Sequence, residues 1–148
     1  MPISGAAGEA SLKRFFVFKL GDDEFAIDIS IVKEVHLPLE VFPVPCAPHF
    51  ILGVANLRGR AVPVIDLKER LGLRLQEREP SRMVVVEVDG CEFIFGIDSH
   101  GEDLLIQENE ILQSPPNLPD EIQQYAVGVI SIGERAILLL EFQPSLLR

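Results

Sequence analysis

The sequence feature that most constrains the fold is the stretch of residues 53–67, in which two apolar segments flank a short cationic turn. β-branched residues are frequent in both segments, which favours extended strands. Gly59 stands between Arg58 and Arg60 and offers the positive φ that a tight hairpin turn needs. Pro63 has no amide hydrogen to donate to a sheet, so we expect it at an edge or a bulge. The stretch therefore predicts two antiparallel strands joined by a positively charged hairpin tip.

A short helix is expected directly after this hairpin. Asp66 and Glu69 have the spacing of a capping box, and Leu67 and Leu71 lie four residues apart, on one face of a helix. Gly72 follows and is predicted to end the helix, because glycine is the commonest residue just past a helical C-terminus. Asp66 is accordingly interpreted as a capping residue and not as a binding residue.

Apolar runs bounded by turn residues predict a chain made largely of strands. Asp89-Gly90 is a strong hairpin signal, and residues 114–119 read as a rigid, proline-rich loop. The remaining strands are predicted over residues 15–20, 25–27, 36–44, 83–88, 93–97, 127–132 and 136–142, with a further apolar strand around residues 104–106.

A second short helix is predicted after Asp28, which can act as its N-cap. Ile29, Val32 and Val35 recur at helical spacing, and Glu34 is expected to turn outward. From this spacing alone, Val32 and Val35 are most simply core residues.

The two halves of the chain look related. Residues 53–67 align with residues 128–142 at a constant shift of 75 positions, and Glu24-Phe25 aligns with Glu92-Phe93 at a shift of 68. Self-similarity of this kind indicates a duplicated structural unit. Two short-stranded β units with few helices imply either two small barrels or one sandwich.

Composition bounds the class of protein. The chain has 148 residues, of which 47% are hydrophobic and 24% charged, as expected for one domain with a real core. Residues 1–13 are small and polar and are predicted to be a flexible tail, with a single domain over residues 14–148. The net charge of −10 argues against nucleic acid or an anionic membrane surface as the main partner. No export signal and no run long enough to span a membrane is evident, so we expect a cytoplasmic protein without membrane insertion.

The residues that usually carry catalysis do not form a recognisable set. His36, His49 and His100 lie at no metal-binding spacing from one another or from a cysteine, and phosphate-binding glycine motifs are missing. Cys46 and Cys91 are expected to be reduced and structural. A pairing of Cys46 with His49 lacks a third, orienting residue and is kept only as a minor alternative. We therefore expect no catalytic, cofactor-binding or metal-binding residues, and a function in binding.

Several segments in this order resemble the CheW-like coupling proteins of bacterial chemosensory arrays. They are Asn56-Leu57-Arg58-Gly59 with Pro63-Val64-Ile65-Asp66-Leu67, the segment of residues 20–29, and the approach to the hairpin over residues 47–53. The resemblance extends from about Phe15 to Leu147. It implies a mostly β fold of two intertwined, small, SH3-like five-stranded β-barrels with a few short helices, in which the last strands return to the first barrel.

The resemblance also implies where partners bind. An arginine at a hairpin tip is usually a solvated turn residue, but the arginine of this motif is a known interaction position in CheW-like proteins. In the family, the tip of a chemoreceptor's cytoplasmic helical hairpin packs beside the groove between the barrels, and the second barrel docks the regulatory domain of a CheA-type histidine kinase. The candidate partner-binding residues are Val32, Glu34, Val35, Asn56, Arg58 and Gly59.

The leading hypothesis is thus a non-catalytic adaptor that couples methyl-accepting chemoreceptors to a CheA-type kinase. Residues 98–103 are more polar than in relatives, which leaves open a scaffold of a non-flagellar pathway such as twitching motility. A small β-barrel enzyme or metabolite-binding protein is an alternative from another class. A third is a CheW-like domain that pairs only with copies of itself in rings.

Overall fold

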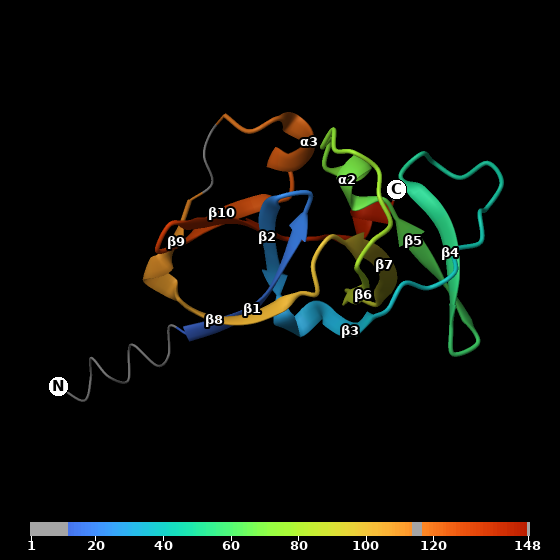
Figure 1. Ribbon diagram of the computed structural model, residues 1–148, viewed down its shortest axis with the longest axis horizontal. Coiled ribbons are helices and arrows are strands. Elements are labelled where there is room, and N and C mark those ends of the chain that lie inside the picture. Colours follow the sequence, from blue (N-terminus) through green and yellow to red (C-terminus); the bar gives the residue numbers. More distant parts are fainter. Residues whose placement is uncertain (1–11, 114–116, 148) are drawn as a thin grey trace.

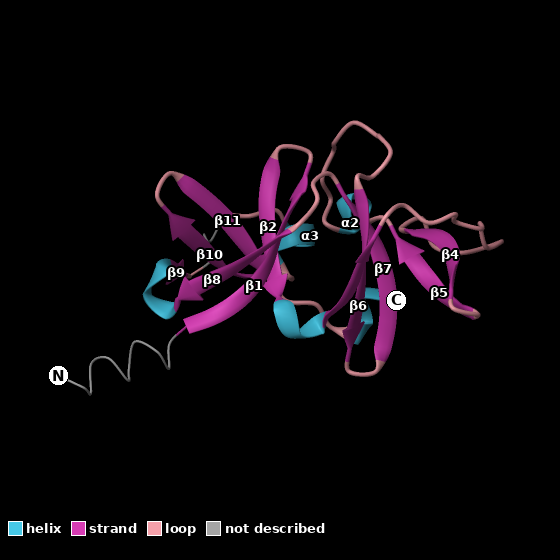
Figure 2. Ribbon diagram, turned by 60° about the horizontal axis from the view of Figure 1, so that its bottom comes forward, coloured by secondary structure: helices cyan, strands magenta, loops and turns pink. Residues whose placement is uncertain are grey.

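Two β-sheets make up most of the molecule (Figure 1), and the computed structural model describes residues 12–113 and 117–147. The predicted tail up to residue 11 and residues 114–116 of the predicted loop lie outside the described residues. The first strand begins at Leu12, three residues before the predicted start. Each sheet curls into a small barrel, and the two barrels lie side by side (Figure 2).

The first sheet takes its strands from both ends of the chain. Its order is β8-β1-β2-β11-β10-β9. Its members are β1 (Leu12–Leu20), β2 (Asp23–Asp28), β8 (Glu102–Gln107), β9 (Ile111–Leu112), β10 (Ala126–Ile132) and β11 (Arg135–Leu140). The last strand therefore returns to pair with β2, in a parallel register.

The second sheet is built from the middle of the chain, in the order β3-β6-β7-β5-β4. Its members are β3 (Val32–His36), β4 (Ile51–Leu57), β5 (Arg60–Ile65), β6 (Arg82–Val88) and β7 (Cys91–Ile97). Four short helical turns connect strands in the described part of the chain, namely η1 (Ile29–Ile31), α2 (Leu67–Arg70), η2 (Glu108–Glu110) and α3 (Asp120–Gln123), and a fifth, η3 (Pro144–Leu147), follows the last strand. The observed fold is the expected pair of intertwined small barrels.

The repeat seen in the sequence reappears as equivalent strands. The β4–β5 hairpin spans Ile51–Ile65 and the β10–β11 hairpin spans Ala126–Leu140, a shift of 75 residues at both ends. Both hairpins join their sheet by a parallel pairing at corresponding residues, Val64 with Ile94 and Leu139 with Ala26. Each barrel is thus one copy of the same strand arrangement.

The hydrophobic core consists of three clusters, one inside each barrel and one shared by both. One fills the first barrel around Val17 and Ile130, and another fills the second barrel around Val64 and Val85. The largest cluster contains side chains of both sheets. Within it the ring centroids of Phe18, on β1, and Phe95, on β7, lie 5.3 Å apart. Because the barrels share this apolar seam, neither is expected to be stable without the other.

Two predictions of local structure are wrong. The helix predicted over residues 29–35 is a single 3₁₀ turn over Ile29–Ile31, after which the chain extends as β3. Asp28 does cap the turn, accepting the Ser30 amide at 2.9 Å, but β-branched valines and pairing with β6 favour a strand from residue 32 onward. The strand predicted over residues 36–44 does not form. The observed strand β3 ends at His36, because prolines follow it and cannot donate to a sheet.

Candidate partner-binding site

The β4–β5 tip is a two-residue turn formed by Arg58 and Gly59. Both residues have positive φ, 52° and 85° respectively, and the Asn56 side chain accepts a hydrogen bond from the Gly59 amide at 2.8 Å. The β6–β7 turn has the same shape, with φ of 48° at Asp89, a residue type that tolerates this region. An arginine there is strained by about 1–2 kcal/mol. The tip therefore holds Arg58 in a conformation that its own backbone disfavours.

Arg58 is held by Glu34 across the second barrel. Its Nη1 donates to Glu34 Oε2 at 2.5 Å and its Nη2 donates to Glu34 Oε1, so the contact is bidentate. Glu34 lies on β3 and Arg58 follows β4, and these are the two edge strands of the sheet. The ion pair thus bridges the open edges of the barrel. The Arg58 side chain remains 63% exposed.

His36 completes a group of three side chains, the Arg58–Glu34–His36 cluster. Its Nε2 lies 2.8 Å from Glu34 Oε1, since residues 34 and 36 point to the same side of β3. The hydrogen bonds from Arg58 lower the pKa of Glu34 to about 2, against the opposing effect of partial burial and with a further contribution from His36. Glu34 is accordingly ionised across the physiological range.

Val32 and Val35 share the other side of the same strand. A register shift between Val32 and Glu34 places them opposite Val86 and Val84, which lie on one face of β6. Val32 packs against the seam cluster, whereas Val35 is 41% exposed. The two valines therefore face one way, as predicted, but a bulged strand places them there instead of a helix.

The structure thus brings Glu34, Asn56, Arg58 and Gly59 together at the tip, whereas Val32 and Val35 lie on the other side of β3. What sequence reasoning missed is the pairing itself, because Glu34 and Arg58 stand 24 positions apart. It also missed His36, which the sequence shows only to lie at no metal-binding spacing. The signal that could have found both was the alternation of Glu34 and His36 on an edge strand, had the strand been recognised.

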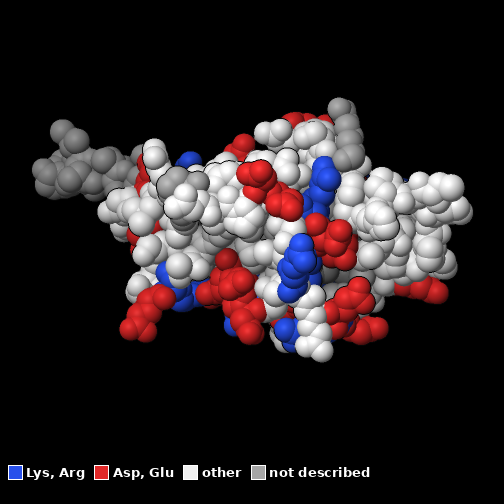
Figure 3. All heavy atoms as spheres, turned by 90° about the horizontal axis from the view of Figure 1, so that it is seen from above, with Lys and Arg blue, Asp and Glu red and all other residues white. Residues whose placement is uncertain are grey.

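An uncharged, apolar surface lies next to this site. Among the described residues it comprises exposed side chains of β3, β4 and the irregular segment between them, namely Val35, Leu37, Phe42, Val44 and Leu52. Seen from above, charged side chains of both signs gather over the middle of the molecule, while the β4–β5 end is largely uncharged (Figure 3). Part of this surface lies within residues 36–44, for which the sequence predicts a strand.

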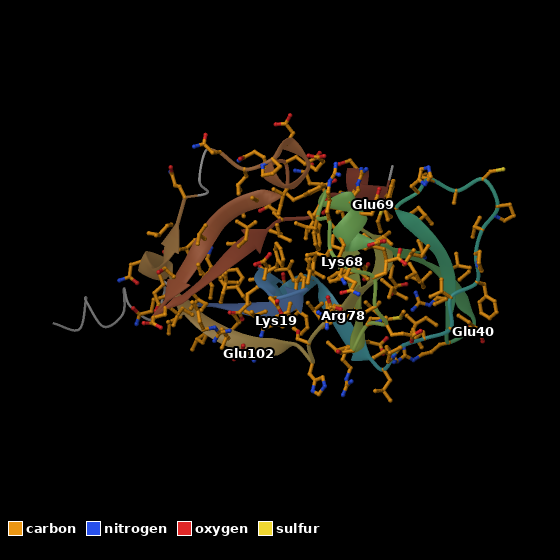
Figure 4. All side chains as sticks on the ribbon, turned by 45° about the horizontal axis from the view of Figure 1, so that its top comes forward. Lys19, Glu40, Lys68, Glu69, Arg78 and Glu102 are labelled. Atoms are coloured by element: carbon orange, nitrogen blue, oxygen red, sulfur yellow. The ribbon has the colours of Figure 1, made fainter. Side chains whose placement is uncertain are left out.

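The polar segment after β7 has an internal role. Asp98 has a side chain only 3% exposed, and it accepts hydrogen bonds from Lys68 Nζ at 2.8 Å and from the Gly21 amide at 2.6 Å. Burial opposes its ionisation, but these donors outweigh that effect and lower its pKa. Lys68 and Arg78 lie where the barrels meet, beside Lys19 (Figure 4). Asp98 therefore fastens the β1–β2 turn of one barrel to α2 of the other.

A groove of about 600 Å³ opens beside this contact, lined by Leu39, Leu52, Met83 and the Lys68–Asp98 pair among others. No group of three or more potential metal ligands is found among the described residues. Cys46 and Cys91 are free thiols. None of the described helices is long and apolar enough to cross a membrane.

Two barrels joined by an aromatic seam, with an ion-paired and exposed hairpin tip, define a paired-barrel domain that offers surfaces for binding. The model of the CheW-like domain matches residues 14–146, and the chain belongs to the CheW-like family. The family and the two-barrel architecture expected from the sequence are thereby confirmed.

Three relatives illustrate the similarity. The chain is 30% identical over 132 residues to a probable chemotaxis protein CheW from Rhizobium etli, covering 88% of this chain and 85% of that protein. It is 29% identical over 140 residues to protein FrzA of Myxococcus xanthus, covering 90% and 85% respectively. The crystal structure of the scaffolding protein TtCheW from Thermoanaerobacter tengcongensis matches with a TM-score of 0.78 at 31% identity, covering 88% of this chain and 90% of that one.

Proposed function

We propose that this protein is a cytoplasmic, non-catalytic adaptor that couples methyl-accepting chemoreceptors to a CheA-type histidine kinase. Membership of the CheW-like family supports a scaffolding role, and relatives of similar length carry names of chemotaxis proteins and of a scaffolding protein. An adaptor that binds two partners at once raises the effective concentration of each near the other.

The observation that carries the proposal is the exposed Arg58, held rigidly at the tip with Val35 exposed on the neighbouring strand. A preorganised guanidinium can make directed hydrogen bonds to carboxylates or carbonyls without losing side-chain freedom at binding. The exposed side chain of Val35, on the strand that carries Glu34, can supply contact area for an amphipathic helix. The combination suits the tip of a receptor's helical hairpin, with Glu34 and Arg58 setting its register.

The kinase would use a different surface. In this proposal its regulatory domain, itself CheW-like, docks barrel to barrel on the second barrel. The exposed Phe42, Val44 and Leu52 supply the apolar area that such a contact needs. Because Phe42, Val44 and Leu52 are not among the residues proposed to bind the receptor, a single copy can offer both surfaces at once.

Co-sedimentation of the protein with a receptor cytoplasmic fragment and the CheA-type kinase of the same genome tests the proposal. Arg58→Ala is expected to lose the receptor fragment. Arg14→Ala is the matched control, since Arg14 is 62% exposed and paired with Asp103 on the other barrel. The control should bind like the wild type, and all variants should keep their melting temperature.

If the wild type binds neither partner, the adaptor role is wrong. A thermal-shift screen with nucleotides and common metabolites then becomes informative. A saturable stabilisation would favour a small-molecule carrier that uses the 600 Å³ groove.

A further inference from the structure

The Glu34 carboxylate contacts two side chains, Arg58 from the β4–β5 tip and His36 from its own strand. One oxygen, Oε1, receives Arg58 Nη2 and lies 2.8 Å from His36 Nε2, while the other receives Arg58 Nη1. The His36 and Glu34 side chains are 30% and 25% exposed. Solvent therefore reaches the imidazole, which can exchange protons in the folded state.

The other charged groups near His36 are already engaged. β6 is the strand that pairs with β3, and its Glu87 binds Lys33 at 3.0 Å while its Arg82 donates to a backbone carbonyl at 2.7 Å. On the facing hairpin, Arg60 is paired with Glu92. Carboxylates and guanidinium groups keep their charge between pH 6 and pH 8, whereas histidine is the side chain type that changes it there.

The charge of the cluster therefore depends on one residue. Arg58 and ionised Glu34 cancel, so the cluster is neutral when His36 is neutral and carries one positive charge when His36 is protonated. We propose that His36 is a positioning residue that holds Glu34 and makes the receptor-binding surface pH-dependent, with tighter binding at lower pH. This inference rests on the proposed function, since it concerns the same site.

The geometry also defines the partner's chemistry. Glu34 engages both Nη atoms of Arg58, and a guanidinium has five N–H donors in all, so donors are left over for a ligand. A surface of donors with a variable positive charge recognises hydrogen-bond acceptors, namely carboxylates and carbonyls. For such a partner, affinity should be about two- to fivefold higher at pH 6 than at pH 8, the size expected for one partly solvated charge.

The test measures the dissociation constant of the receptor cytoplasmic fragment at pH 6, 7 and 8. His36→Gln keeps an N–H donor for Glu34 but cannot gain a charge, so its dissociation constant should show no pH dependence of its own between pH 6 and pH 8. His49→Gln and His100→Gln are matched controls, because both side chains are exposed histidines outside the cluster. They should keep the wild-type slope. A flat wild-type profile, or a slope that survives in His36→Gln, overturns the proposal.

A second measurement needs no partner. The Arg58 Nε–H resonance is followed by NMR from pH 8 to pH 6 in the same proteins. It should shift with a single titration in the wild type and in both controls, and stay still in His36→Gln. If the receptor fragment binds no variant at any pH, the adaptor role fails, and this resonance still decides the cluster: a shift confined to proteins with His36 supports the coupled charge, and its absence overturns it.

Discussion

The two hairpin tips of the molecule are equivalent in the fold and different in chemistry. Arg60 at the β4–β5 tip pairs with Glu92, and Arg135 at the β10–β11 tip pairs with Glu24, so the two ion pairs correspond under the repeat. Arg58, however, corresponds to Gly133. One tip therefore carries an extra, strained arginine that the other tip lacks.

The carboxylate opposite each tip is also conserved between the halves of this chain. Glu34 pairs across its ladder with Val85, and Glu102 holds the corresponding position opposite Val17. In the first barrel, Glu102 is bound by Arg135, which at the same time holds Glu24 at 2.6 Å. The first barrel is thus bridged by one arginine, which is why its tip can be a glycine.

This difference bears on whether the fold itself requires Arg58. The first barrel closes with a glycine, Gly133, at the positive-φ position of its turn, so the strained arginine and the second ion pair of the other barrel are not required by the fold. Strain that the fold does not need is a recurrent mark of a functional position. The comparison therefore separates Arg135, which bridges the first barrel, from Arg58, the residue proposed to bind a partner.

The largest effect on stability is expected at the apolar seam, where the two barrels pack against each other. Phe95→Ala removes a fully buried ring from the shared seam and should lower the free energy of unfolding by about 3–5 kcal/mol, as for other buried aromatic truncations. Unfolding in urea, followed with probes in both barrels, should remain one transition. Two separate transitions would show that the barrels are independent units.

The next test replaces one arginine by glycine at each of the two hairpin tips. Arg58→Gly copies the other tip, relieves a positive-φ arginine, and should change stability by no more than about 0.5 kcal/mol while weakening receptor binding at least tenfold. Arg135→Gly should do the reverse, lowering stability by about 1–2 kcal/mol because Glu24 loses its partner, with binding retained. Urea unfolding and the binding assay decide between them. Equal stability losses in the two variants would remove the distinction.

The clamp at Asp98 offers a third comparison, because the corresponding position of the other half is Ser30. Asp98→Asn keeps the shape but loses the charge that binds Lys68, and should destabilise the protein by about 1–2 kcal/mol. Ser30→Ala should have almost no effect. Chemical denaturation of both variants measures the asymmetry, and matching losses would contradict it.

The smallest effect is the acid dependence of stability. The pKa of Glu34 is about 2 in the folded protein, below its ordinary value of 4.5, so its contribution to the free energy of unfolding is present above pH 4.5 and is lost as the pH falls towards 2. Wild type and Glu34→Gln, which leaves the turn unchanged, should therefore differ in stability at pH 5 and converge near pH 2. Denaturation curves across this range provide the measurement. A difference that persists at pH 2 would show that the ionisation of Glu34 is not its cause.

The sequence allowed the strand hairpins to be predicted because their turns carry local signals, such as Asp89-Gly90, and because the repeat of 75 residues duplicates them. It could not predict β3, where valines three apart fit a helix equally well and only pairing with β6 decides. Nor could it predict the Arg58–Glu34–His36 cluster, since that contact depends on how the edges of a sheet approach each other. The local turn signals could therefore be recognised in the sequence, whereas contacts between distant strands could not.

The return of β11 to β2 has a consequence for biosynthesis. The strands of the second barrel lie within residues 32–97 and can pair as soon as they leave the ribosome, but the first sheet needs β2 and β11, which are separated by more than a hundred positions. The N-terminal hairpin must wait for β10 and β11 before its other face, which carries Val17 and Ala26, is covered. For this chain the order of synthesis and the order of folding are therefore opposed, and the newly made β1–β2 hairpin is the segment most in need of a chaperone.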